Sequence, residues 1–185
     1  MDCADCANCP LRTYWEKKGT WQPVPFEGNG SDILVLGDAP SKQDAVTRRP
    51  FTDAHGITVM EELRRMGVGQ RFGVDWGNLL GCRWPDDNPK TYLAKLKGQN
   101  RRRVKAGKKP LQSPLKACWG YVEKQLGRYT TVLTLGPHAA KALLEGNPAL
   151  EAVRGGPTKA GALKVLPTYH PRLLQVKPEL REVFA

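Results

Sequence analysis

The stretch DILVLGDAPSKQD, residues 32–44, decides the fold class of this chain. It begins with DILVLG, a short apolar run with β-branched side chains at Ile33 and Val35, which is typical of a buried strand. Gly37 ends this run, and a polar loop follows it. Because α/β proteins keep binding and catalytic groups in loops at the ends of strands, we expect functional residues directly after Gly37.

The rest of the chain alternates between predicted strands and predicted helices. Apolar runs predict three more strands, within residues 73–85, 130–136 and 162–169. Apolar side chains at helical spacing, or a proline suited to a first helical turn, predict helices within residues 57–67, 114–126 and 137–144. This alternation predicts an α/β fold with a central parallel four-stranded sheet flanked by helices. Given the length of 185 residues, we expect a single domain over residues 1–185.

The chain is strongly basic, with 29 Lys and Arg against 18 Asp and Glu and a formal net charge of +11. The polar segment 86–113 has turn residues and little apolar periodicity, so we expect a basic insertion loop there. Its cations gather at Arg101, Arg102, Arg103, Lys105, Lys108 and Lys109. Such a block favours a polyanionic partner, most often nucleic acid. A solvated loop without a partner is the alternative; an anionic membrane is a weaker one, because the block lacks an amphipathic apolar face.

The N-terminal residues MDCADCANCPLRTYW, 1–15, are polar where a signal peptide would be apolar. The sequence also has no run of 18 apolar residues, so we expect a cytoplasmic protein that does not associate with membranes. We also expect the protein to be a monomer. In a reducing compartment the five cysteines are not expected to form disulfides. Cys3, Cys6 and Cys9 form two overlapping C-x-x-C pairs, a spacing that suits one metal ion or one metal cluster.

One histidine near the C-terminus lies in PTYHPRLL, residues 167–174. His170 follows the last predicted strand, and Pro171 stops that strand and fixes the backbone just beyond the histidine. On its own, this pattern is compatible with a structural histidine as well as with a functional one. The other motifs of the chain must decide between these interpretations.

Six short motifs occur in a familiar order: GDAP (37–40), RRPF (48–51), GNLLGCRWP (77–85), TLGPHAAKALL (134–144), VRGG (153–156) and PTYHPRLL (167–174). With them, the chain resembles the iron–sulfur, family 4 branch of the uracil-DNA glycosylase superfamily from about residue 6 to residue 174. That family shows a C-x-x-C near the N-terminus, G-E-(A/G)-P-G, R-P-F-V-G, T-N-x-x-K-C-R-P-P, L-G-x-x-A-A and a closing H-P-S. The chain departs from this pattern at Asp38, Ser41, Asp53, Trp84 and Arg172, which bears on substrate choice and rate more than on fold.

The resemblance implies a [4Fe–4S] cluster with Cys6, Cys9, Cys82 and Cys118 as its ligands. Because the last two lie on either side of the basic insertion, the cluster would clamp the ends of that insertion to the N-terminal segment. Four thiolates also form a closed tetrahedral zinc site, and the spacing does not separate the two. Cys3 could take the place of Cys6, or be a free surface thiol.

The resemblance further implies a pocket for a base flipped out of the DNA stack. Phe51 matches the family's stacking phenylalanine, with a core phenylalanine as the alternative. Asn78 is expected to read the pyrimidine edge, because one amide can accept from N3–H and donate to O4. Gly37 and Ala39, at the start of the loop after the first strand, are assigned to the same substrate-binding site.

His170 and Asp38 are the expected catalytic residues. Breaking the C1′–N1 bond leaves negative charge on the pyrimidine, and a His170 N–H aimed at O2 would stabilise that charge. Asp38, at the mouth of the first strand, is the candidate that orients the attacking water and stabilises the cationic sugar. The alternative is that Asp38 only caps the turn that follows it.

Together these residues predict a monofunctional DNA glycosylase for base excision repair. It would hydrolyse the N-glycosidic bond of uracil, or of a related deaminated or modified pyrimidine, in DNA and leave an abasic site. Single- or double-stranded DNA is the expected partner, with the cations of residues 101–109 and Arg172 on its phosphates. Two alternatives stay open: a glycosylase retuned to another modified base, and a catalytically silent DNA-binding module of the same fold.

Overall fold

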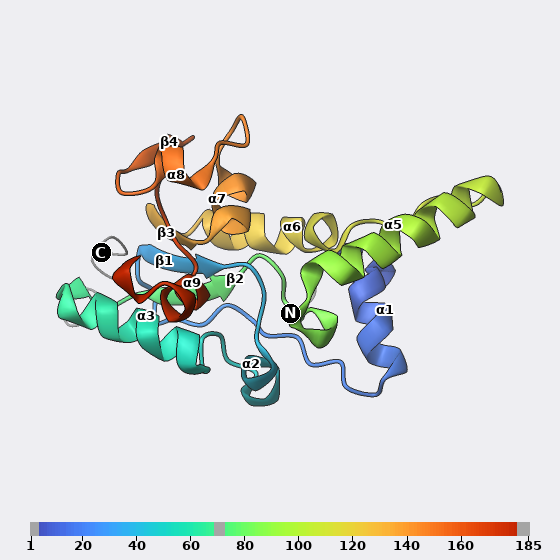
Figure 1. The fold of residues 1–185 in the computed structure, drawn as a ribbon, viewed down its shortest axis with the longest axis horizontal. Helices are drawn as coiled ribbons and strands as arrows, with labels where there is room; N and C mark the ends of the chain where they lie inside the picture. The colour runs from blue at the N-terminus through green and yellow to red at the C-terminus, as the bar shows by residue number, and fades with distance from the viewer. Residues whose placement is uncertain (1–3, 69–72, 181–185) are drawn as a thin grey trace.

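The computed structural model describes residues 4–68 and 73–180, which are built around one five-stranded sheet (Figure 1). The strands are β1 (Ile33–Gly37), β2 (Asp75–Asn78), β3 (Thr131–Leu135), β4 (Thr158–Ala160) and β5 (Leu163–Thr168), in the order β2-β1-β3-β5-β4. β1 pairs in parallel with β2 and β3, and β3 pairs in parallel with β5. The predicted α/β class and its four parallel strands are confirmed, and their carboxyl ends meet at one edge of the sheet.

The predicted strand count is wrong, because the sheet has a fifth strand. β4 is an edge strand that pairs antiparallel with β5, and the turn between them contains Gly161 with a φ of +60°. Its sequence, TKA, shows no apolar alternation from which a strand could be predicted. A short, charged strand is typical of a sheet edge, since it discourages pairing with another chain.

Helices cover both faces of the sheet (Figure 1). α6 (Pro114–Leu126) and α7 (Pro137–Leu143) lie on one face, where Leu34 and Leu36 of β1 pack with Val122. Successive residues of a strand point to opposite faces, so the intervening Val35 contributes to the other core.

On that second face lie α3 (Ala54–Arg65) and α9 (Pro171–Val176). The short elements α2 (Lys42–Thr47), α8 (Leu150–Val153) and η3 (Pro178–Leu180) complete this part of the chain. Within residues 4–68 and 73–180, none of the helices combines the length and the apolar character that a bilayer span requires.

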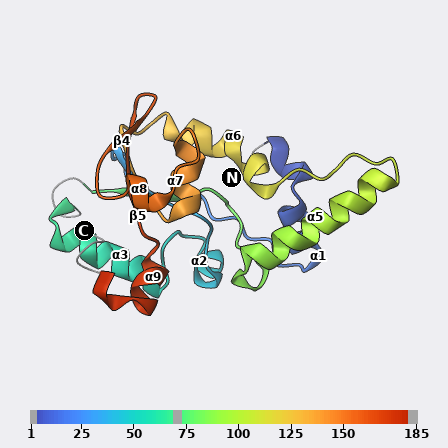
Figure 2. The same ribbon diagram turned by 45° about the horizontal axis from the view of Figure 1, so that its top comes forward.

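The N-terminal segment forms a second, smaller packing unit beside the sheet. η1 (Ala4–Asn8) and α1 (Pro10–Lys17) lie next to the start of α6 and the start of α5 (Figure 2). Trp15 of α1 is buried, and its indole N–H donates a 2.9 Å hydrogen bond to the Arg83 carbonyl. This contact joins α1 to the chain that runs from β2 toward α5.

Residues 86–113 are mainly a helix, so the prediction of a loop is wrong. After η2 (Pro85–Asp87), the helix α5 (Pro89–Lys105) begins where the Asn88 side chain accepts from the Thr91 N–H. Leu96 is the one buried residue of α5, so the apolar stripe that identifies most helices is missing. Its many Lys, Arg, Gln, Leu and Ala residues are good helix formers, which explains why it forms nevertheless.

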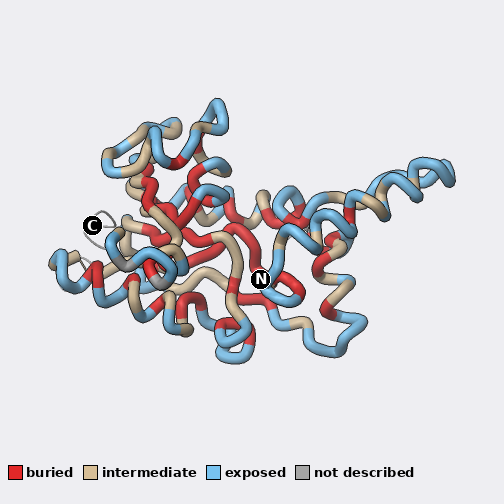
Figure 3. The backbone as a smooth tube through the Cα atoms, in the orientation of Figure 1, coloured by how far each residue is buried: buried red, intermediate tan, exposed pale blue. Residues whose placement is uncertain are grey.

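α5 projects from the body of the molecule, and its outer half is exposed (Figures 1 and 3). The chain after the helix is tied back to it, because the Asn100 amide donates to the Leu111 carbonyl at 3.0 Å and accepts from the Leu111 N–H at 2.8 Å. The Arg103 Nε–H donates to the Lys109 carbonyl at 2.9 Å. We call residues 89–111 the α5 arm; its tip carries the basic block.

Candidate active site

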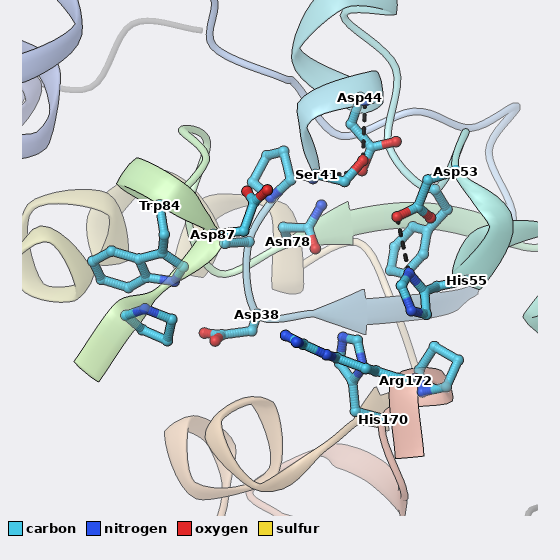
Figure 4. Close-up of a pocket in the computed structure, with 15 residues that line it drawn as sticks. Asp38, Ser41, Asp44, Asp53, His55, Asn78, Trp84, Asp87, His170 and Arg172 are labelled. Carbon is cyan, nitrogen blue, oxygen red and sulfur yellow. Dashed lines mark hydrogen bonds and ion pairs between the residues drawn. The ribbon is translucent and has the colours of Figure 1, made fainter. Parts of the chain in front are cut away.

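A pocket of about 540 Å³ opens at the carboxyl edge of the sheet, where β1 and β2 end and α9 begins (Figure 4). Residues from separate parts of the sequence meet there. Of those predicted to hold or transform a substrate, the ones that line it are Asp38, Ala39, Phe51, Asn78, His170 and Arg172. The strand-end positions inferred from the sequence are therefore neighbours in space.

Gly37 makes this convergence possible because it has no side chain. The parallel register places it opposite Asn78, across β1 and β2. A Cβ atom on Gly37 would lie 2.5 Å from Asn78 Oδ1 and 2.8 Å from Phe51 Cζ. The glycine thus lets the two residues expected to hold the base approach the end of β1.

Phe51 has a left-handed backbone conformation, with a φ of +58°. This geometry is unusual for a bulky residue and persists only where surrounding contacts hold it. Gly56 in the first turn of α3 lies so close that a Cβ there would overlap the Phe51 carbonyl. The Phe51 ring is buried, with its centroid 5.2 Å from that of Trp76. Phe51 is therefore both a wall of the pocket and part of the core.

A buried carboxylate, Asp44, joins two of the loops that border the pocket. Its Oδ1 accepts from the backbone N–H and the hydroxyl of Thr52, at 2.6 and 2.8 Å, and its Oδ2 accepts from the Ser41 N–H at 3.0 Å. Ser41 accepts from the Asp44 N–H in return, which forms a capping box at the start of α2. Sequence reasoning missed Asp44, although the S-x-x-D spacing of residues 41–44 is a signal that could have found it.

His170 is the N-cap residue of α9, and its Nδ1 accepts a 3.1 Å hydrogen bond from the Arg172 N–H. A neutral imidazole that accepts at Nδ1 carries its proton at Nε2, so the other side of the ring is a donor. Burial, and next the electrostatic interaction with His55, lower the pKa of His170 to about 4. The ring that lines the pocket in Figure 4 is therefore neutral near pH 7 and offers an N–H.

Asp53 and His55 form a pair at the same end of the pocket (Figure 4). Asp53 caps α3 by accepting from the Gly56 N–H at 3.0 Å, and its Oδ2 lies 3.1 Å from His55 Nδ1. Burial alone would raise the pKa of Asp53, but the hydrogen bonds from Gly56 and His55 outweigh it and lower that pKa. The His55 and His170 ring centroids are 6.1 Å apart. Sequence reasoning missed His55, which belongs to no motif.

Asp38 is paired with a histidine that sequence reasoning also missed. Its Oδ2 lies 3.1 Å from His138 Nδ1 at the start of α7. The hydrogen bond to Asp38 raises the pKa of His138, although partial burial opposes this. The side chain that caps α2 belongs to Ser41 rather than Asp38. Only the fold brings residues 38 and 138 together, since β1 lies next to β3.

Of the residues predicted to bind phosphates, only Arg172 lines the pocket. It is exposed, and Figure 4 shows its side chain extending past His170 toward the Asp38 side. The cations of residues 101–109 lie at the tip of the α5 arm (Figure 1). Arg103 is half-buried and the others are exposed. The structure thus separates the basic block from the pocket.

The four cysteines predicted as ligands are buried, and none of them forms a disulfide: Cys6, Cys9, Cys82 and Cys118. The last three share one core cluster, and the Cys9 N–H donates to the Cys6 carbonyl at 3.1 Å. Burial raises the pKa of the Cys9 thiol. In the part of the chain that the structure describes, His, Cys, Asp and Glu side chains do not converge in threes on a point that could hold one metal ion. Cys3 lies outside the described residues.

Comparisons with known proteins show the family of this chain. A model of the Uracil DNA glycosylase superfamily matches residues 25–184. The Type-4 uracil-DNA glycosylase of Pyrobaculum aerophilum is 29% identical over 97% of this chain and 84% of its own length. The Type-4 uracil-DNA glycosylase of Sulfurisphaera tokodaii is 25% identical over 96% of this chain and 74% of its own length. That of Thermotoga maritima is 26% identical over 91% of this chain and 77% of its own length. Because the superfamily match covers most of the sequence, from before β1 to beyond α9, this chain belongs to the uracil DNA glycosylase superfamily, and it is similar to the type-4 enzymes.

Proposed function

We propose that this protein is a monofunctional DNA glycosylase that removes uracil from DNA and leaves an abasic site for base excision repair. The observation that carries the proposal is the state of His170, a neutral ring whose Nδ1 is occupied by the Arg172 N–H and which lines the pocket. As the C1′–N1 bond breaks, negative charge gathers on the pyrimidine and its O2. An N–H donor at O2 binds that charge more strongly than it binds neutral uracil, so it lowers the barrier to bond cleavage.

The base must first leave the DNA stack, since the sugar carbon cannot be reached inside a duplex. In the pocket the pyrimidine ring would lie on Phe51, with its N3 and O4 edge at Asn78. Both side chains are largely buried, so their contacts with the base would be dry. An Asn78 amide that accepts from N3–H and donates to O4 is mismatched with cytosine at both atoms. Each mismatch would cost about 1–3 kcal/mol.

Water completes the reaction at C1′. The electron pair of the C1′–N1 bond leaves with the base, and a water oxygen forms a new bond to the cationic sugar. One water proton is lost, and the uracil anion gains a proton, so the products are the abasic sugar and neutral uracil. Asp38 would orient the water and stabilise the cation. Its hydrogen bond to His138 holds the carboxylate in place for this role.

Contacts with the DNA backbone would come from two places. Arg172 is at the pocket itself, and the exposed cations of residues 101–109 are on the α5 arm. Such cations bind phosphates without reading sequence, and they release counterions when they do. The arm would therefore add affinity for any DNA.

We also propose that Cys6, Cys9, Cys82 and Cys118 hold a [4Fe–4S] cluster. Four buried thiols without disulfides suit such a group. The cluster would act as a structural clamp between the N-terminal segment and the two ends of the α5 arm.

Metal analysis tests the cluster. We expect a brown protein with about four iron and about four sulfide per chain. Zinc without iron would contradict the proposal. Cys118→Ser should lose both iron and stability, because it removes a ligand next to the arm. Cys3→Ser is the matched control and should keep both; iron loss in that variant would instead make Cys3 a ligand.

The function is tested with oligonucleotides that each carry one uracil, cytosine, thymine or modified pyrimidine, in single- and double-stranded form. Abasic sites are detected as strand breaks after alkali treatment. We expect breaks at uracil and not at cytosine. Breaks only at another base would support a glycosylase retuned to that base. This is the second candidate function, and the Asp53–His55 pair at the pocket favours it. No breaks at any base, with DNA binding retained, would leave a silent DNA-binding module.

A further inference from the structure

One end of the pocket takes no part in the chemistry above, and Trp84 forms its wall. Only 5% of Trp84 is exposed, yet its indole Nε1 has no hydrogen-bond partner among the residues that the structure describes. Figure 4 shows the indole at the opposite end from Asp53 and His55, with its nitrogen-bearing ring turned toward the Asp38 side. A buried N–H without a partner is costly, so a donor of this kind suits an acceptor that arrives with a ligand.

The backbone around Trp84 fixes the position of this donor. Asp86 and Asp87 both have left-handed conformations, with φ of +54° and +48°. The tight turn is closed by the Asp87 N–H, which donates to the Trp84 carbonyl at 3.2 Å. The Trp84 ring packs with its centroid 5.7 Å from that of Tyr92. Consecutive left-handed residues other than glycine are strained, and such strain is found mostly at functional sites.

The charges at the Trp84 end of the pocket favour the binding of an anion. α5 begins here, with Pro89 lining the pocket and no acidic residue in its first turn, so the positive end of its dipole faces the pocket. The nearby carboxylates have partners of their own: Asp87 lies 3.7 Å from Arg83 Nη1, and Asp38 Oδ2 lies 3.1 Å from His138 Nδ1. Arg172 adds a positive charge from the other side (Figure 4).

We propose that Trp84 is a substrate-positioning residue whose indole N–H donates to a phosphate oxygen of the DNA strand that carries the flipped nucleotide. The proposal rests on the proposed glycosylase function and adds a subsite to it. The dipole of α5 and Arg172 would share the charge of that phosphate. Holding the backbone at this end would place C1′ near Asp38 and the base near His170.

Trp84→Phe tests the contact, because it keeps an aromatic ring and removes the N–H. In single-turnover assays on uracil-DNA, we expect the rate at limiting protein to fall roughly 10-fold or more, as for a hydrogen bond to a charged acceptor. The rate at saturating protein should stay within about 3-fold of the parent's, since the contact exists before the bond breaks. Trp21→Phe is the control: its indole N–H is also buried and without a partner in the described residues, but it does not line this pocket.

The parent protein provides a second test that needs no variant. Each phosphate next to the uracil is replaced in turn by a neutral methylphosphonate. We expect one position at which the parent slows by a similar factor, and at which Trp84→Phe causes no further decrease. A Trp84→Phe protein equal to the parent, or decreases that add at every phosphate, would overturn the proposal. If the parent makes no abasic product at all, the proposed function fails instead, so the two failures are distinguishable.

Discussion

The charged groups of the pocket and those of the α5 arm differ in how far they are held by hydrogen bonds. In the pocket, Asp38, Asp44 and Asp53 each have hydrogen-bond partners that fix the direction of the carboxylate. At the tip of the arm, the cations of residues 101–109 are mostly exposed to water. A partnered, partly buried charge acts on one atom at one place, whereas an exposed cation attracts any phosphate. The difference indicates that the pocket determines rate and base choice, and that the arm determines affinity.

Gly37→Ala tests this contrast and is expected to have a large effect on the rate of uracil release. The new Cβ would lie 2.5 Å from Asn78 Oδ1 and 2.8 Å from Phe51 Cζ, so both side chains must move. Displacements of about 1 Å at a reacting centre can slow a reaction about 10²-fold, and we expect at least this decrease in single-turnover uracil release. Gly98→Ala is the matched control on the arm, where an added Cβ meets nothing within 4 Å. It should leave the rate unchanged; a decrease equal to that of Gly37→Ala would contradict the separation of roles.

A smaller effect, on base choice, is expected from Asn78→Asp. A carboxylate can still accept from N3–H but cannot donate to O4, so uracil keeps only one of its two hydrogen bonds to this residue. We expect about a 10-fold slower release of uracil, from the 1–3 kcal/mol typical of such a hydrogen bond. The ratio of the rate of uracil release to the rate of cytosine release should therefore fall as well. An unchanged ratio would show that another group reads the base.

Neutralising the arm should change affinity and leave the chemistry intact. The triple change Arg101→Gln, Arg102→Gln and Arg103→Gln should weaken binding to every DNA sequence. The slope of log K against log salt should flatten by up to about 0.9 for each duplex phosphate that the arm no longer neutralises. Fluorescence anisotropy at several salt concentrations measures this slope. A slope equal to the parent's would mean that the arm does not touch phosphates.

The smallest expected effect is on the pH dependence of stability. The pKa of His170 is about 4 in the folded protein against an ordinary value of 6.5, so between these pH values the unfolded chain binds a proton that the folded chain excludes. The free energy of unfolding should therefore fall as the pH is lowered from about 6.5 to about 4. The pKa of His138 is raised in the folded protein, so its contribution to the free energy of unfolding is present at low pH and is lost as the pH rises.

Urea titrations across this range measure the effect. The His170→Gln variant should show a flatter dependence than the parent. Since His138 is unchanged in that variant, any decrease in stability above pH 6.5 should remain. Equal dependence in both proteins between pH 4 and 6.5 would contradict the burial of a neutral His170.

The sequence was most informative where function depends on the end of a strand. Gly37, Asn78 and Thr168 end β1, β2 and β5, and His170 follows two residues later. Parallel strands bring their carboxyl ends to one edge, so short motifs at those ends predicted one pocket. Phe51 was found through its motif, although its left-handed backbone was not foreseen.

The residues that were missed depend on contacts between distant segments or on weak local signals. His138 meets Asp38 only because β3 pairs with β1, and no local pattern around either residue contains that information. The predicted helix at 57–67 begins earlier, at Ala54, because Asp53 caps it. α5 was not predicted, because a helix that buries only Leu96 shows no apolar residues repeating at helical spacing.

The central claim, that base release depends on a donor at His170 and not on the basic arm, is tested most directly by single-turnover uracil release at saturating protein. His170→Ala should slow this rate by roughly 10²–10³ while binding DNA about as tightly as the parent. The triple arginine variant should show the reverse, with the parent's rate at saturation and weaker binding. A His170→Ala protein that releases uracil at the parent's rate would contradict the account and leave His170 as a structural cap of α9.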